Sequence, residues 1–188
     1  VPLARRQTTG EACVAVTLGG ERAFARLLSF VPGTTLSGSG YLAPSVVRAL
    51  GTLVARVDLA LADLPHTALE TSGQWDMRRA ADVSRALLPA VSDPALRARL
   101  ENVLESAWAV IGQHAGSLPT QVIHGDLTDD NVVTSDPITR FPDGLIDLGD
   151  LAVSWTIAEL AITLSSLLHH DGITLPAALG AASAYHQV

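Results

Sequence analysis

A short polar run lies between two apolar segments in the stretch "VIHGDLTDDNVV", which spans residues 122–133. The flanking apolar segments are typical of buried strands, and the loop between them contains Asp126, Asp129, Asp130 and Asn131. A solvated turn also favours Asp and Asn, because their short side chains hydrogen-bond to nearby backbone groups. The stretch therefore predicts two buried strands joined either by an ordinary turn or by a set of oxygen ligands held against a core.

The segment before residue 41 predicts a β-hairpin followed by a connection. Residues 12–18 and 21–30 flank Gly19-Gly20, and a two-residue Gly-Gly link between such runs is typical of a hairpin. The stretch "VPGTTLSGSG" that follows has the glycines and the proline of a segment where the chain changes direction.

Helices dominate the rest of the chain. Apolar residues recur every three or four positions from Pro44 to Leu64, which predicts a helix that packs on a core. Asp93 and Pro94 have the N-cap and first-turn chemistry of another helix. Further helices are expected at about residues 75–91, at 155–169 and from Pro176 to the last residue, and short strands at about 120–123, 131–134 and 144–150.

Composition excludes several classes of protein. A chain of 188 residues that is 48% hydrophobic can form one domain, or most of a two-lobed one. The net charge of −7 argues against a nucleic-acid partner. The apolar run "TIAELAITLSSLL" is interrupted by Glu159 and is too short to span a bilayer, so no membrane contact is expected. No signal peptide is visible, and the single Cys13, expected in the core, fits a cytoplasmic protein.

Two metal sites can be tested against the acidic loop, and both fail. In a calcium loop that begins at Asp126, the sixth position would be Gly and the twelfth Glu, but they are Asn131 and Pro137. A zinc site lacks ligands, because the chain has one Cys and scattered His residues. The pair His169-His170 is interpreted as a solvated helix end.

Phosphoryl transfer makes a demand that the loop does meet. An Asp must orient the attacking hydroxyl, and further oxygen ligands must hold magnesium against the nucleotide phosphates. The spacing required is an Asp, four residues, an Asn, and then an Asp at the end of the next strand. Asp126, Asn131 and Asp147 have this spacing.

The two segments "HGDLTDDN" and "GLIDLGD" together resemble the catalytic and metal-binding segments of the aminoglycoside phosphotransferase and choline kinase-like family, a branch of the protein-kinase fold. The resemblance extends more weakly to "WDM" and to "ARLLSFVPGTTL", which is similar to the last N-lobe strand and the hinge. It implies an α+β, protein-kinase-like fold that is mainly the helical C-lobe. Residues 1–36 would be the end of the N-lobe, with a small β-hairpin, and residues 37–188 a catalytic lobe that is incomplete at its C-terminus.

The resemblance also implies roles for individual residues. Asp126 would be the catalytic base, and Asn131 and Asp147 would be magnesium ligands. His124 and Gly125 would support the loop structurally.

Other residues have weaker assignments. Asp129 and Asp130 would bind the acceptor or be solvated, Asp150 would orient its loop, and the hinge at Ser29, Phe30 and Val31 would contact the nucleotide base. The residues expected in the core are Trp75, Trp108 and Trp155, and Arg78 and Arg79 are expected on a solvated helix face. Glu159 is expected on the wet face of its helix, with pairing inside the substrate cleft as the alternative.

The function implied is an ATP- and magnesium-dependent phosphotransferase acting on a small-molecule alcohol, such as an aminoglycoside, an amino-alcohol or a hydroxylated amino acid. The acidic balance suits a cationic acceptor. The chain has no Lys, although kinases of this fold hold the phosphates with one. We therefore expect a piece of a longer protein, possessing further domains, that is inactive alone. The alternative is a pseudokinase-like binding or scaffold module.

Overall fold

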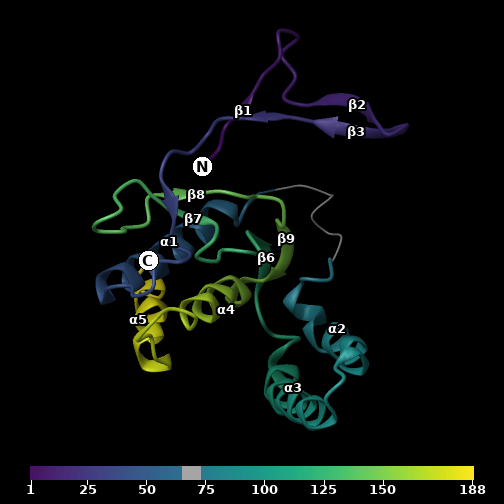
Figure 1. Ribbon diagram of the computed structural model, residues 1–188, viewed down its shortest axis with the longest axis vertical. Coiled ribbons are helices and arrows are strands. Elements are labelled where there is room, and N and C mark those ends of the chain that lie inside the picture. The colour runs from purple at the N-terminus through teal and green to yellow at the C-terminus, as the bar shows by residue number, and fades with distance from the viewer. Residues whose placement is uncertain (65–72) are drawn as a thin grey trace.

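The computed structural model describes residues 1–64 and 73–188. A hairpin of β2 (Val14–Leu18) and β3 (Glu21–Ala25) projects from a body of helices and short strands, as Figure 1 shows. The two strands turn at Gly19-Gly20, so the predicted hairpin is confirmed. At its base, β1 (Ala4–Arg5) pairs with β4 (Leu27–Leu28).

The hairpin has no buried residue in either strand. Cys13, next to its first strand, is exposed, so the expectation that this residue lies in the core is wrong. An alternating apolar pattern is buried only where a second layer covers it, and among the described residues none covers these strands.

The helices of the body follow the predicted order. They are α1 (Pro44–Leu61), η2 (Met77–Arg79), α2 (Ala80–Leu87), η3 (Leu88–Ala90), α3 (Pro94–His114), α4 (Thr156–Leu167) and α5 (Leu175–Tyr185). Asp93 caps α3 as expected, because its carboxylate accepts hydrogen bonds from the amides of Ala95 at 2.8 Å and Leu96 at 3.3 Å. No helix in the described ranges combines the length and the apolar character that crossing a bilayer requires.

Two small sheets hold the two ends of the polar loop. One sheet has the order β5 (Thr34–Thr35), β7 (Val132–Thr134), β8 (Gly144–Leu145), and the other pairs β6 (Thr120–Ile123) with β9 (Ala152–Trp155). The loop at residues 124–131 therefore leaves one sheet and enters the other.

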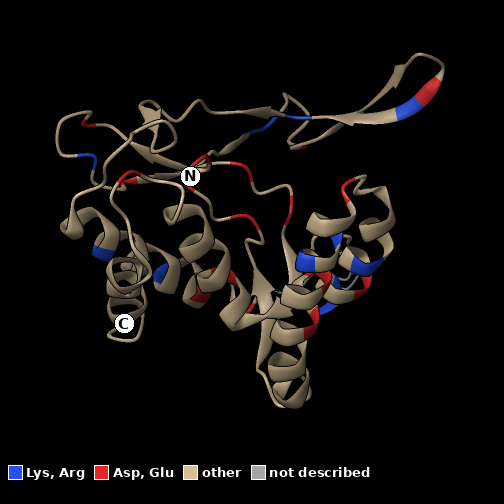
Figure 2. Cartoon of the chain, turned by 60° about the horizontal axis from the view of Figure 1, so that its bottom comes forward, with Lys and Arg blue, Asp and Glu red and all other residues tan. Residues whose placement is uncertain are grey.

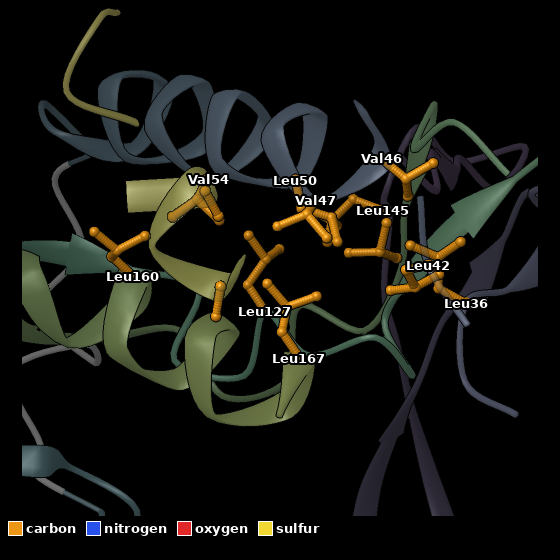
Figure 3. Close-up of a cluster of buried hydrophobic side chains, with 13 residues drawn as sticks. Leu36, Leu42, Val46, Val47, Leu50, Val54, Leu127, Leu145, Leu160 and Leu167 are labelled. Carbon is orange, nitrogen blue, oxygen red and sulfur yellow. The ribbon is translucent and has the colours of Figure 1, made fainter. Parts of the chain in front are cut away.

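The main core lies between α1, α4 and α5, and it includes one residue of the polar loop. Figure 3 shows Leu127 among side chains of α1 and α4. Leu127 is fully buried, so the loop is attached to the core through its own side chain. The helices α1 and α5 approach so closely that a Cβ atom at Gly51 would lie 1.9 Å from the carbonyl oxygen of Ala181.

A second, smaller core joins α3 to β9. The ring centroids of Trp108 and Trp155 lie 6.2 Å apart. Trp155 is buried and Trp108 is partly buried against the same cluster, so the prediction that both pack in a core is confirmed. Trp75 is different, because 72% of its surface is exposed. The expectation that Trp75 packs in the core is therefore wrong.

An acidic group is buried where α1 meets α5. The Tyr185 hydroxyl donates to Oδ2 of Asp58 at 2.7 Å, whereas Oδ1 of Asp58 is buried without a hydrogen-bond partner. Burial raises the Asp58 pKa from 3.8 to about 6, although the Tyr185 hydrogen bond acts in the opposite direction. The folded state thus favours the protonated acid.

A pH-dependent effect of Asp58→Asn follows. A raised pKa in the folded state adds stability below about pH 4, and this stability is lost as the pH rises through about 6. Because Asn never ionises, the variant should gain up to roughly 3 kcal/mol of unfolding free energy relative to the wild type between about pH 4 and pH 8. Urea denaturation across this range measures the difference. Asp63→Asn, at an exposed position, should show none, and a constant difference for Asp58→Asn would contradict the prediction.

Candidate active site

The polar loop begins with a buried histidine. His124 has no exposed surface; its Nδ1 accepts from the amide of Asp126 at 3.3 Å, and its Nε2 lies 3.2 Å from the carbonyl oxygen of Ile146. A ring whose Nδ1 accepts and whose Nε2 donates is the neutral Nε2–H tautomer. His124 thereby joins the backbone of the loop to the strand segment that precedes Asp147.

Gly125 fits a position that no other residue could occupy easily. Its φ of +80° is left-handed, and a Cβ atom here would lie 2.6 Å from the carbonyl oxygen of Asp150. Two loops that are separated in sequence therefore touch through backbone at this point.

Asp126 is oriented by the amide of Asn131. The Nδ2 of Asn131 donates to the Asp126 carbonyl oxygen and to the Asp126 Oδ2, both at 2.8 Å. Burial raises the Asp126 pKa; the Asn131 hydrogen bond opposes this effect, and the carboxylates of Asp150 and Asp147 add to it. A raised pKa improves the ability of a carboxylate to accept a proton.

Asp147 follows β8, which pairs with β7 at the end of the polar loop. The Ile146 amide donates to the Asn131 carbonyl oxygen at 2.9 Å, so Asp147 follows directly on a backbone contact with Asn131. Asp147 has a left-handed φ of 57°, and its Oδ1 accepts from the Gly149 amide at 3.1 Å. Asp tolerates this conformation better than most residues, and such backbone outliers concentrate at functional sites.

Three polar residues of α4, Glu159, Thr163 and Ser166, form a polar stripe that hydrogen-bonds to the loop. Glu159 has no exposed surface, and its Oε2 and Oε1 accept from the amides of Gly125 at 2.9 Å and Leu127 at 3.1 Å. Thr163, one turn further, donates to the Leu127 carbonyl oxygen at 2.7 Å. The expectation that Glu159 lies on a wet helix face is therefore wrong: its polar partners are the backbone of the loop.

The charge state of Glu159 has two opposing influences. Burial raises its pKa overall, although the hydrogen bonds from the amides of Gly125 and Leu127 act in the opposite direction. Both carboxylate oxygens accept hydrogen bonds, which is the geometry of the ionised form.

Asp129 is bound at the far end of the same stripe. Its amide donates to Oγ of Ser166 at 3.3 Å, and its Oδ2 lies 3.1 Å from Nε2 of His170. The other ring nitrogen of His170 lies 3.1 Å from the Gly40 carbonyl oxygen. His170 is buried, so the interpretation of His169-His170 as a solvated end holds for His169 only.

A pocket opens beside the carboxylate of Asp126. It has a volume of about 490 Å³ and is lined by Trp75, Met77, Gly125, Asp126, Asp150 and Ile162. A neighbouring hollow of about 540 Å³ shares Met77 and Ile162 and includes Asp129, Asp130 and His169 in its lining. Figure 2 shows acidic residues on several of the loops that lie between the hairpin and the helices. Asp130 is exposed and lines the hollow of about 540 Å³.

The segment "WDM" is fixed by an ion pair. The Asp76 carboxylate accepts from Arg78 at 2.7 Å and from the Ser154 hydroxyl at 2.7 Å, and Arg78 also donates to the Val153 carbonyl oxygen at 2.6 Å. Burial alone would raise the Asp76 pKa, but these hydrogen bonds lower it overall. Arg78 therefore has a structural role instead of the solvated one expected, whereas Arg79 is on the surface.

Of the three predicted hinge residues, Val31 lies against β8. A Cβ atom at Gly144 would be 3.2 Å from Cγ1 of Val31, and Phe30 is 86% exposed. The Ser29 amide donates to the Leu3 carbonyl oxygen at 2.8 Å, so this amide is engaged within the protein. A contact to a nucleotide base would fall to Phe30 and Val31.

A magnesium ion fits the oxygen ligands of Asn131 and Asp147. The Nδ2 of Asn131 faces Asp126, which leaves Oδ1 as the ligand atom, and one oxygen of Asp147 remains beside the one that accepts from Gly149. In residues 1–64 and 73–188, no three His, Cys, Asp or Glu side chains could form a metal site by themselves. Magnesium bound with a nucleotide needs only one or two protein carboxylates, because phosphates and waters complete its shell.

The fold is the protein-kinase-like fold of small-molecule phosphotransferases. An amicoumacin kinase solved with AMP-PNP, Ca²⁺ and Ami has a similar fold, with a TM-score of 0.64 and 13% identity over 96% of this chain and 54% of that one. An aminoglycoside phosphotransferase from Streptomyces rimosus aligns with a TM-score of 0.55 and 25% identity, covering 89% of this chain and 64% of that one.

The sequence comparisons identify the family. Residues 6–187 match the "Phosphotransferase enzyme family", and the chain belongs to it. It is 26% identical over 155 residues to a hydroxylysine kinase from Xenopus laevis, which corresponds to 76% of this chain and 41% of that protein. The chain thus spans less than half the length of this curated relative.

Sequence reasoning missed most of the residues that hold the loop. Glu159, Thr163 and Ser166 recur at spacings of four and three, so they share one face of α4, and His170 follows in the turn after the helix. A polar stripe on the apolar side of a helix is the signal that could have found them. Sequence reasoning also missed that Trp75 lines the pocket, and the only sequence feature that could have indicated it was its place beside Asp76 in the segment "WDM".

Replacement of the buried acid should loosen the loop. Glu159→Gln keeps the size of the side chain but turns an NH₂ group toward a backbone N–H, so one buried amide loses its acceptor. We expect a loss of about 1–3 kcal/mol in unfolding free energy by urea denaturation. Glu101→Gln, on the exposed surface of α3, should change stability by less than about 0.5 kcal/mol. Equal stabilities for the two variants would show that the Glu159 contacts are unimportant.

Proposed function

We propose that this chain forms the catalytic lobe of a small-molecule kinase that transfers the terminal phosphoryl group of ATP to an alcohol, with magnesium as cofactor. The observation that supports it most is the Asp126 carboxylate, which is held by Asn131, flanked by Asp147 and Asp150, and open to a pocket of about 490 Å³. Family membership supports the reaction class.

The chemical step needs one proton acceptor. The acceptor hydroxyl would lie against Asp126, which orients it and takes its proton as the hydroxyl oxygen bonds to the γ-phosphorus. The bond from that phosphorus to the β,γ-bridging oxygen breaks, and ADP leaves. Most of the rate enhancement in such transfers comes from positioning and electrostatics, so a loop held rigidly by α4 suits the reaction.

Magnesium bound by Asn131 and Asp147 would neutralise phosphate charge. Asp147 follows the backbone contact with Asn131, which supports placing both ligands on the same side of the loop. Phe30 and Val31 would provide the backbone groups that meet the nucleotide base, next to β7 and β8.

The acceptor would be a small alcohol, and a cationic one suits the acidic surroundings. Asp130 and Asp150 are exposed at the two hollows, so their carboxylates are available for an ammonium group. Asp129 already faces His170, which makes its contribution to substrate binding indirect. The relatives act, by their names, on hydroxylysine, aminoglycosides and amicoumacin.

A non-catalytic binding module is the second candidate, because the chain contains no Lys to hold nucleotide phosphates. Acceptor-dependent release of ADP from ATP by the full-length protein separates the two functions. Turnover supports the kinase. Nucleotide or partner binding without turnover supports the module.

Asp126→Asn should abolish most of the transfer while preserving the fold. The amide cannot accept the proton, so we expect kcat to fall by about 10²–10⁴-fold in the coupled ADP-release assay. Asp82→Asn, on the surface of α2, serves as the control and should retain full activity. Activity of Asp126→Asn within about twofold of the parent would remove this residue from the role.

Asp147→Ala should weaken nucleotide binding that depends on magnesium, because the substitution removes a hard oxygen ligand. Calorimetric titration with AMP-PNP, with and without magnesium, measures this directly and does not need turnover. We expect the gain in affinity that magnesium gives the parent protein to be lost. The same gain in parent and variant would assign the metal to other ligands.

A further inference from the structure

Trp75 is an exposed indole on a rigidly held segment. Although 72% of its surface is exposed, its neighbour Asp76 has a side chain that is 1% exposed and is bonded to Arg78 and to Ser154 of β9. An exposed tryptophan costs solvation free energy, and here the backbone beside it is anchored by the ion pair of the buried Asp76 with the partly exposed Arg78. The point at which the Trp75 side chain leaves the backbone is therefore held by contacts of its neighbour, although the indole itself is not packed in the core.

The anchored indole lines the pocket of the catalytic carboxylate. Trp75 and Met77 line this pocket together with Asp126, Asp150 and Ile162 of α4. A volume of about 490 Å³ is in the range of small-molecule sites. The backbone contact between Gly125 and Asp150 keeps the two acidic loops together.

Among the residues that the structure describes, the lining combines the Trp75 side chain with carboxylates and includes no cationic side chain. An ammonium group is attracted both to the face of an indole and to a carboxylate, whereas an anionic acceptor would find only repulsion. Because Asp126 is occupied with the hydroxyl in the proposed reaction, Trp75 and Asp150 are left to bind a charged group near that hydroxyl. The apolar Met77 and Ile162 would contact the carbon chain that connects the two.

We propose that Trp75 is a specificity-determining residue of the acceptor site, and that it selects alcohols with an ammonium group close to the hydroxyl that is phosphorylated. The inference rests on the proposed kinase function and deepens it. Trp75 binds the cation through its ring face, Asp150 supplies the counter-charge, and the uncharged wall of Met77 and Ile162 admits an aliphatic linker.

The experiment compares Trp75→Leu and Trp75→Phe in the full-length protein. The probes are 5-hydroxylysine and 5-hydroxynorleucine, which has the same hydroxyl but lacks the adjacent amino group. For 5-hydroxylysine, we expect KM to rise about tenfold in Trp75→Leu and by less in Trp75→Phe, with kcat and the KM for ATP within twofold of the parent. For 5-hydroxynorleucine, the parent and the variants should have the same, higher KM.

Tyr41→Leu is the matched control, since Tyr41 is 58% exposed and does not line the pocket. It should change none of these values. An unchanged KM for 5-hydroxylysine in Trp75→Leu, or equal KM values of the parent for the two probes, would overturn the inference and leave the kinase function standing.

Fluorescence separates this failure from failure of the kinase function. Of the three tryptophans, only Trp75 lines the pocket, so 5-hydroxylysine should change the emission of the parent and not that of Trp75→Leu. If no alcohol stimulates ADP release but this signal is present, the proposed function fails and the cation site at Trp75 survives. If the signal is absent from the parent, the site at Trp75 is refuted.

Discussion

The site depends on one buried carboxylate that binds backbone instead of solvent. Glu159 is buried on the side of α4 that faces the core, and its two carboxylate oxygens accept hydrogen bonds from the amides of Gly125 and Leu127. A loop of polar residues next to a core leaves donors that water cannot reach, and a buried charge is tolerated only where such donors satisfy it. The helix and the loop therefore stabilise each other, and the residue between the two amides is Asp126.

The consequences extend along the loop in both directions. The side chain of Leu127 packs in the main core, and the Thr163 hydroxyl donates to the Leu127 carbonyl oxygen. The side-chain amide of Asn131 donates to the Asp126 carbonyl oxygen and so closes the turn. Preorganised groups of this kind need no rearrangement when charge moves during a reaction. The position of the Asp126 carboxylate thus depends on α4, which is itself packed on α1 and α5.

Candidate site residues that lie close together in the sequence could be selected from their spacing. Residues whose surroundings come from distant parts of the chain could not be assigned in this way. Asp126, Asn131 and Asp147 were selected because their spacing matches the demand of phosphoryl transfer; the structure brings them together, and their roles stay predictions. Glu159 was assigned to solvent because a helical pattern does not reveal that backbone donors approach its apolar face. Trp75 and Cys13 were assigned to the core because hydrophobicity predicts burial only where another element arrives to cover the residue.

The amide hydrogens of Gly125 and Leu127 report most directly on whether α4 holds the loop before any ligand binds. Their exchange with solvent can be followed by NMR in the ligand-free protein, with the amide of the exposed Asp130 as the reference. The structure predicts that both amides exchange about as slowly as those in the middle of α4. Exchange of both as fast as that of Asp130 would contradict the account, because the proposed catalytic carboxylate of Asp126 would then belong to a loop that opens freely.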